Sequence, residues 1–170
     1  MTLKLMPTDE GLFSLEVSAE RTVQNISRYK QEIKNSFALD EWGRSQKSKI
    51  ATCTMKFGGK LYDATKPRSD LGPDAIGVET ESVSIGHGQD VLLVSKGYEI
   101  KDSNDEFLIA FAHPTANPIV DVQMPAGFSH TFGFGVPGSE MTKSSITERY
   151  ELNGTQFPGQ YMRLRWWPSP

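Results

Sequence analysis

From residue 50 onward this chain is divided into short strand-like segments, and this pattern constrains the fold more than any other sequence feature. From Ile50 to Trp167 apolar and polar residues alternate, with turn-forming clusters between the alternating stretches. A period of two places apolar side chains on one face of an extended strand, and closely spaced turns are typical of sandwiches and barrels. Helical spacing does not separate these segments, so a parallel βαβ sheet is not expected. The predicted strands are residues 50–57, 78–85, 91–100, 106–112, 119–124, 128–134, 146–152 and 161–167.

The N-terminal part of the chain predicts two further elements. Short alternating segments at residues 3–5 and 13–17 flank a turn-rich cluster, which predicts a hairpin. Apolar residues then recur at spacings of three, four and seven, as on one face of a helix: Ala19, Val23, Ile26, Ile33 and Phe37. We therefore expect an amphipathic helix from about Ala19 to Trp42 that packs on the sheet, with a coiled coil as the alternative.

These patterns predict a mainly β fold with one long helix: an antiparallel β-sandwich or distorted β-barrel with an N-terminal hairpin and an amphipathic helix. A length of 170 residues suits one sizeable core. We expect a single domain over 1–170, with N-terminal strands at 1–17, the helix at 18–42 and a β-rich core at 49–167.

The lone Cys53 cannot form an internal disulfide, which favours a reducing compartment, and we interpret it as a small buried side chain. No apolar run reaches the length of a membrane span, and the N-terminus lacks the apolar stretch of a signal peptide. A cytoplasmic location is therefore expected. The formal net charge of −3 gives no overall attraction to nucleic acid, so a nucleic-acid partner is not expected.

The last predicted strand carries a candidate binding face. Its alternation places Tyr161, Arg163, Arg165 and Trp167 on one face, and three apolar residues on the other. Arginine offers a planar fork of donors to phosphate or carboxylate, and tyrosine and tryptophan can stack on rings. The alternative is a solvated face on which arginine lies across the aromatic rings.

A second candidate feature is the run Pro125-Ala126-Gly127-Phe128-Ser129-His130, which continues as a strand with Phe132 and Phe134 on the same face as His130. An imidazole in an aromatic row is either a hydrogen-bonded core group or the polar end of a pocket. We expect His130 to be at least partly buried, with a ring nitrogen hydrogen-bonded to a protein group or ordered water.

The spacing Pro125-x-Gly127-x-x-His130 resembles the second motif of the cupin superfamily. That resemblance implies a β-barrel in which His130 binds a metal, and His87 would supply a further ligand. Gln89 stands where the first cupin motif would place its second histidine.

The sequence shows no nucleophile elbow, Walker A loop or Cys-x-x-Cys pair, which favours a non-catalytic role without metal or cofactor. Our main hypothesis is a binding or assembly module that recognises a small ligand or a protein partner, with Tyr161, Arg163, Arg165, Trp167 and His130 as binding residues. The alternatives are a cupin-like metalloenzyme and a structural assembly subunit. A homo-oligomer stays open under each of them.

Overall fold

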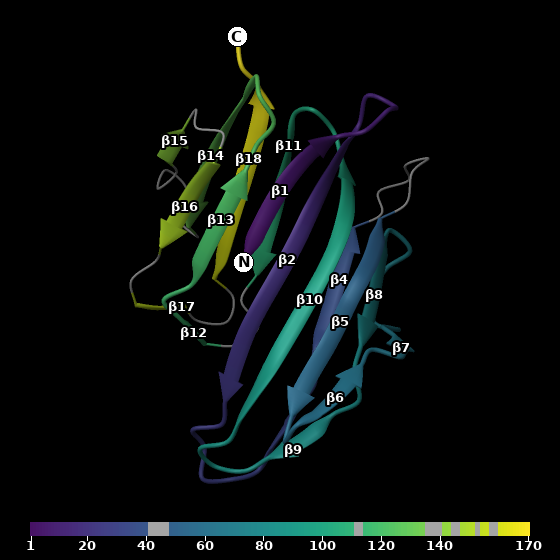
Figure 1. Ribbon diagram of the computed structural model, residues 1–170, viewed down its shortest axis with the longest axis vertical. Coiled ribbons are helices and arrows are strands. Elements are labelled where there is room, and N and C mark those ends of the chain that lie inside the picture. Colours follow the sequence, from purple (N-terminus) through teal and green to yellow (C-terminus); the bar gives the residue numbers. More distant parts are fainter. Residues whose placement is uncertain (41–47, 111–113, 135–140, 144–146, 152–153, 157–159) are drawn as a thin grey trace. The chain divides into compact units, whose positions relative to one another are not determined.

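The computed structural model describes residues 1–40, 48–110, 114–134, 141–143, 147–151, 154–156 and 160–170, and every regular element in these ranges is a β-strand (Figure 1). Their contacts group into two compact units, of which unit 1 comprises Met1–Leu15 with Lys101–Pro170, and unit 2 comprises Glu16–Ile100. Strands β2 (Phe13–Gln24) and β10 (Asp90–Lys101) have residues in both units. The β-rich class predicted from the sequence is confirmed.

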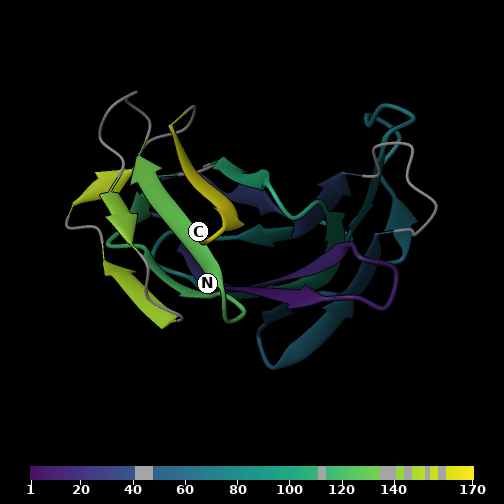
Figure 2. The same cartoon turned by 90° about the horizontal axis from the view of Figure 1, so that it is seen from above.

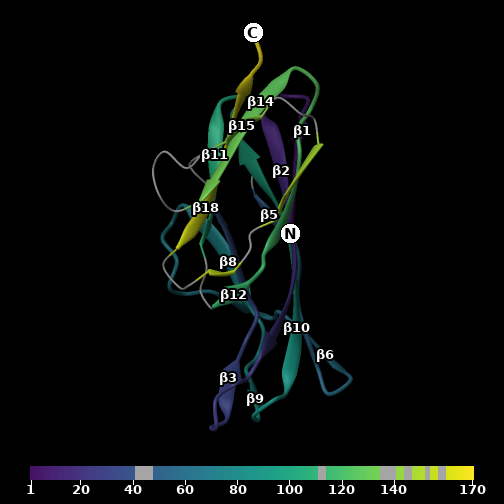
Figure 3. The same ribbon diagram turned by 90° about the vertical axis from the view of Figure 1, so that its left-hand side faces the viewer.

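Unit 1 contains two main sheets that form a sandwich. The first has the order β16-β13-β1-β2, and the second has the order β11-β18-β14-β15. Rings from the two sheets meet between them: Phe13 contacts Phe128 with ring centroids 4.9 Å apart, and Phe132 stacks on Tyr150 at 4.3 Å. Figures 2 and 3 show β1 and β18 in opposite layers. The strands are β1 (Thr2–Pro7), β11 (Asp105–Ala110), β13 (Ile119–Gln123), β14 (Phe128–Phe134), β15 (Met141–Lys143), β16 (Thr147–Glu151) and β18 (Tyr161–Pro168).

The strand pairing of unit 1 is mostly antiparallel. One exception is β1, which runs parallel to β13 with Thr2 opposite Asp121. The short strands β12 (Thr115–Ala116) and β17 (Thr155–Gln156) form a small antiparallel pair of their own. The described strands form open sheets with two edges each, so the barrel alternative is not seen among them.

Unit 2 is built on a sheet of order β2-β10-β5-β6, together with the smaller sheets β4-β8-β7 and β3-β9. One buried apolar cluster of this unit contains Met55, Val83, Ile85, Val91 and Leu93. The other strands of the unit are β3 (Gln31–Ile33), β4 (Ser36–Asp40), β5 (Lys49–Phe57), β6 (Lys60–Asp63), β7 (Lys66–Pro67), β8 (Ala75–Glu79) and β9 (Val83–Ile85).

The helix predicted at residues 18–42 is wrong. Residues 18–24 belong to β2, and the strands β3 and β4 follow, while residues 41 and 42 lie outside the described residues. The apolar residues that suggested a helical stripe come from three different strands and from the segment between β2 and β3, so their spacing has no helical meaning. The coiled-coil alternative fails for the same reason.

Polar residues at inward positions concealed the strand period. Along β2, Leu15 and Val17 are buried, and the same face continues with Ala19, Arg21 and Val23, of which Arg21 is exposed, so a charge interrupts the apolar alternation. Asn25 and Asn35, which follow in the sequence, are buried, and their side chains donate hydrogen bonds to backbone carbonyl groups. Asparagine competes for backbone hydrogen bonds in this way, which disfavours helix and favours turns.

Candidate binding face

Strand β18 alternates between core and surface as the sequence predicts. Met162, Leu164 and Trp166 are at most 2% exposed, and their side chains fill the sandwich of unit 1. The opposite face carries the four residues singled out from the sequence, and all of them are exposed or half-buried: Tyr161, Arg163, Arg165 and Trp167. The alternation of residues along the strand was sufficient to predict this, because it fixes the face on which each side chain lies once one face of the strand is buried.

The neighbouring strands extend this surface on both sides. On β11, Leu108 lies opposite Arg163 and is 53% exposed, while Glu106 lies opposite Arg165. The Arg165 Nε atom is 3.7 Å from Glu106 Oε2, and both side chains are about half exposed, so this ion pair is weak. We call the four outward residues of β18 together with Leu108 the β18 face.

Small residues of β14 border the β18 face on its other side. Ser129 lies opposite Trp167, Thr131 opposite Arg165, and Gly133 opposite Arg163. Long arginine and tryptophan side chains therefore stand beside a row of short ones. Thr131 is only 8% exposed, so this side of β14 offers little free surface to a partner.

His130 lies on the other side of β14, inside the sandwich. It is 0% exposed, and its Nε2 atom is 2.8 Å from the hydroxyl of Tyr150 on β16. The predicted burial and hydrogen bond are confirmed. The structure does not bring His130 together with the four residues of the β18 face, because neighbouring positions of β14 point to opposite sides.

Tyr150 links the two sheets and is itself buried. Burial, with the nearby charge of Glu148 as a second cause, raises the pKa of Tyr150 to about 12. The phenol therefore stays protonated at neutral pH, where its hydroxyl can donate to His130 and its ring stacks on Phe132. His130 and Phe132 therefore have a structural place in the core, which is one of the two alternatives that the sequence left open.

His87, the other histidine implied by the cupin resemblance, is exposed in unit 2, between β9 and β10. Its Nδ1 atom is 3.1 Å from the carbonyl oxygen of Ser27. Across the part of the chain that the structure describes, no three histidine, cysteine, aspartate or glutamate side chains gather as metal ligands would. The metal role of His130 and His87, which only the cupin alternative implies, stays untested.

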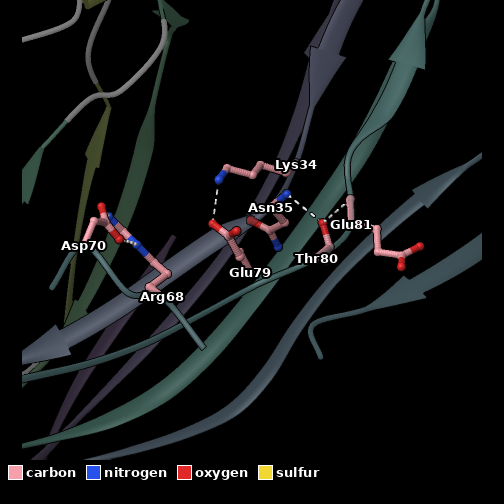
Figure 4. Close-up of polar contacts among 7 residues, drawn as sticks. All are labelled: Lys34, Asn35, Arg68, Asp70, Glu79, Thr80 and Glu81. Atoms are coloured by element: carbon pink, nitrogen blue, oxygen red, sulfur yellow. Dashed lines mark hydrogen bonds and ion pairs between the residues drawn. The ribbon is translucent and has the colours of Figure 1, made fainter. Parts of the chain in front are cut away.

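Glu79 and Glu81 flank a group of polar contacts in unit 2, which includes the carboxylate of Glu79 and only the backbone carbonyl of Glu81 (Figure 4). Glu79 ends β8 and pairs with Lys34 at 2.6 Å, while Glu81 follows the strand. Between them Thr80 accepts a hydrogen bond from the backbone N–H of Asn35. The charged partner of Glu79 is therefore the ammonium group of Lys34.

Sequence reasoning missed Asn35, a buried polar residue of unit 2 whose side chain makes several hydrogen bonds. Its Nδ2 atom donates to the carbonyl oxygens of Thr54 and Val94, at 2.8 and 3.0 Å, and lies 3.2 Å from Ser95 Oγ. Asn35 is 0% exposed, so these bonds tie the start of β4 to β5 and β10. The signal that could have revealed it is the alternation of Asn35, Phe37 and Leu39, which continues through the asparagine.

Cys53 is buried beside this network, as the sequence predicts. Burial raises the pKa of its thiol, although Ser95 and Arg21 act in the opposite direction. Desolvation also lowers the pKa of the Arg21 guanidinium. A buried protonated thiol is a poor nucleophile, so Cys53 serves as a core side chain.

The comparisons with known proteins give no family for this chain. The sequence matches none of the protein-family models against which it was scanned, and a search of curated proteins also found no match. Among the described residues there is no helix long and apolar enough to cross a membrane. The functional argument therefore rests on the residues themselves.

Proposed function

We propose that this chain is a non-catalytic binding module that recognises a protein partner through the β18 face. The observation that carries the proposal is the clustering of an exposed leucine, two arginines, a tyrosine and a tryptophan on adjacent strands of one sheet. Tyrosine, tryptophan and arginine are enriched among residues that dominate binding at protein interfaces.

The chemistry of the face indicates what the partner presents. Arg163 and Arg165 are two positions apart on one strand, so their guanidinium groups share one side and can bind carboxylates with paired hydrogen bonds. Leu108 and Tyr161 offer apolar surface beside them. A partner with acidic side chains next to an apolar or aromatic one would fit this arrangement.

Unit 1 supplies a rigid support for this face. The inward side chains of β18 are fully packed, and Trp166 also donates from Nε1 to the carbonyl oxygen of Asp102 at 3.0 Å. A face whose backbone is fixed before binding loses less conformational entropy when a partner docks.

Affinity purification of the full-length chain tests the proposal. The variant Arg163→Ala/Arg165→Ala should lose proteins that co-purify with the wild-type chain. Its circular dichroism and melting temperature should change little, because exposed substitutions are usually tolerated. The matched control is Arg149→Ala, which removes an exposed arginine from the other sheet of unit 1 and should keep the same partners.

Two results of these experiments would contradict the proposal or change it. An identical set of bound proteins for the wild-type chain and the double variant would refute the proposal. Sedimentation distinguishes the assembly alternative, because an oligomer of the pure chain that the double variant dissociates would make the β18 face a contact between copies.

A further inference from the structure

The two most exposed large apolar side chains among the described residues lie in one loop, far from the β18 face in the sequence. Ile26 is 82% exposed and Tyr29 is 78% exposed, and both belong to the segment between β2 and β3. Figure 3 shows this segment at the same end of unit 2 as the segment between β9 and β10. We call residues 25–30 and 86–89 the tip loops.

The tip loops are held in shape by the buried side chain of Asn25. Its Nδ2 atom donates to the carbonyl oxygens of Tyr29 and Ile85, both at 2.9 Å, and its Oδ1 atom accepts from the backbone N–H of Ser27 at 2.8 Å. The exposed apolar side chains are therefore presented by a fixed backbone, since Asn25 is only 4% exposed.

Several polar backbone groups of the tip loops also have internal partners. The backbone N–H of Asn25 donates to the carbonyl oxygen of Gln89, and the N–H of Gly88 donates to the carbonyl oxygen of Asn25. The N–H of Tyr29 donates to Ser27 Oγ at 3.1 Å. The carbonyl oxygen of Gly88 accepts from Gln24. A loop whose backbone groups are already bonded is less costly to remove from bulk water, because unbonded polar groups are the expensive ones to desolvate.

The charges of the tip loops are positive. Arg28 and Lys30 are exposed, and neither loop contains a carboxylate; the first ones beyond are Glu32 on β3 and Asp90 at the start of β10. Long basic side chains can lie along an apolar surface with their charge at the headgroups, and tyrosine favours the same depth.

We propose that the tip loops bind the surface of a lipid bilayer that carries anionic headgroups, with Ile26 and Tyr29 inserted and Arg28 and Lys30 at the phosphate level. A bilayer accepts a small convex projection without a matching cavity. A stable protein interface needs about 800 Å² from each partner, which is more than a few loop side chains offer. Each basic residue near an anionic surface strengthens binding roughly fivefold.

The test is co-sedimentation of the full-length chain with vesicles at low ionic strength. Vesicles of phosphatidylcholine with phosphatidylserine should bind the wild-type chain, and vesicles of phosphatidylcholine alone should bind it more than tenfold less, about the combined effect of two basic residues. Ile26→Ser/Tyr29→Ser and Arg28→Gln/Lys30→Gln should each weaken binding by about tenfold or more. The control Leu61→Ser, at a residue 59% exposed on β6, should bind like the wild-type chain.

Three results would overturn the inference. These are no binding to either kind of vesicle, equal binding by the wild-type chain and both tip variants, and equal loss of binding in the Leu61→Ser control. Loss of a co-purifying protein in the tip variants, without any vesicle binding by the wild-type chain, would identify the tip loops as a protein contact instead.

Discussion

Replacing Gly97 with alanine tests directly whether residues 36–40 form a strand that packs on β10. A Cβ atom at position 97 would lie 2.7 Å from Leu39 Cδ1, 2.9 Å from Phe37 Cε1 and 3.0 Å from the carbonyl oxygen of Lys49. The register of β10 on β5 also shifts between Lys96 and Gly97, so the backbone is irregular at this point. The two side-chain atoms can move, but the backbone oxygen cannot move without disturbing β5.

The magnitude follows from two opposing effects. Overpacking a closed core costs about 1–3 kcal/mol of stability. In the opposite direction, Gly→Ala stabilises the folded state by about 0.4–1 kcal/mol, because alanine lowers the conformational entropy of the unfolded chain. We therefore expect Gly97→Ala to lower the free energy of unfolding by about 1–2 kcal/mol. At roughly 2–4 °C per kcal/mol for a chain of this size, the melting temperature should fall measurably.

Urea unfolding followed by circular dichroism measures this change. Gly72→Ala is the matched control, because a Cβ atom there would meet nothing within 4 Å, and we expect it to stay within about 0.5 kcal/mol of the wild-type chain. Leu39→Ala alone should cost about 2–5 kcal/mol, since Leu39 is 2% exposed. In that background Gly97→Ala should cost less. Equal effects of Gly97→Ala and Gly72→Ala would refute the packing of β4 on β10.

Three further predictions concern single buried groups. Asn35→Ala should lower the free energy of unfolding by about 2–4 kcal/mol in urea titrations, because two carbonyl oxygens lose a buried donor. An effect below about 1 kcal/mol would contradict a stabilising role for these two hydrogen bonds. The pKa of Tyr150 is raised to about 12 from an ordinary value near 10, so its contribution to stability is complete below about pH 10 and is lost as pH rises toward 12. Tyr150→Phe should therefore flatten the alkaline fall in stability seen in urea titrations, and an unchanged fall would count against burial of the phenol. Elemental analysis of the purified chain should find no stoichiometric metal; zinc, iron, manganese or nickel that His130→Ala removes would favour the cupin-like enzyme.

The strands with uninterrupted alternation could be predicted from the sequence. Residues 128–134 and β18 behave as expected, since the side of each residue is a local property that follows from the period of the strand. The same argument placed the four outward residues of β18 and the buried position of His130. It could not identify Tyr150 as the partner of His130, because that bond joins strands of two different sheets.

Tertiary structure decided the secondary structure of residues 18 to 40. The inward positions there include Asn25 and Asn35, and a polar residue becomes acceptable inside only when distant strands supply its hydrogen-bond partners. The carbonyl oxygens that accept from Asn35 belong to β5 and β10, so no window of sequence around position 35 contains them. The sequence by itself therefore determined the β-rich class and the β18 face, while long-range hydrogen bonds decided that this region forms strands.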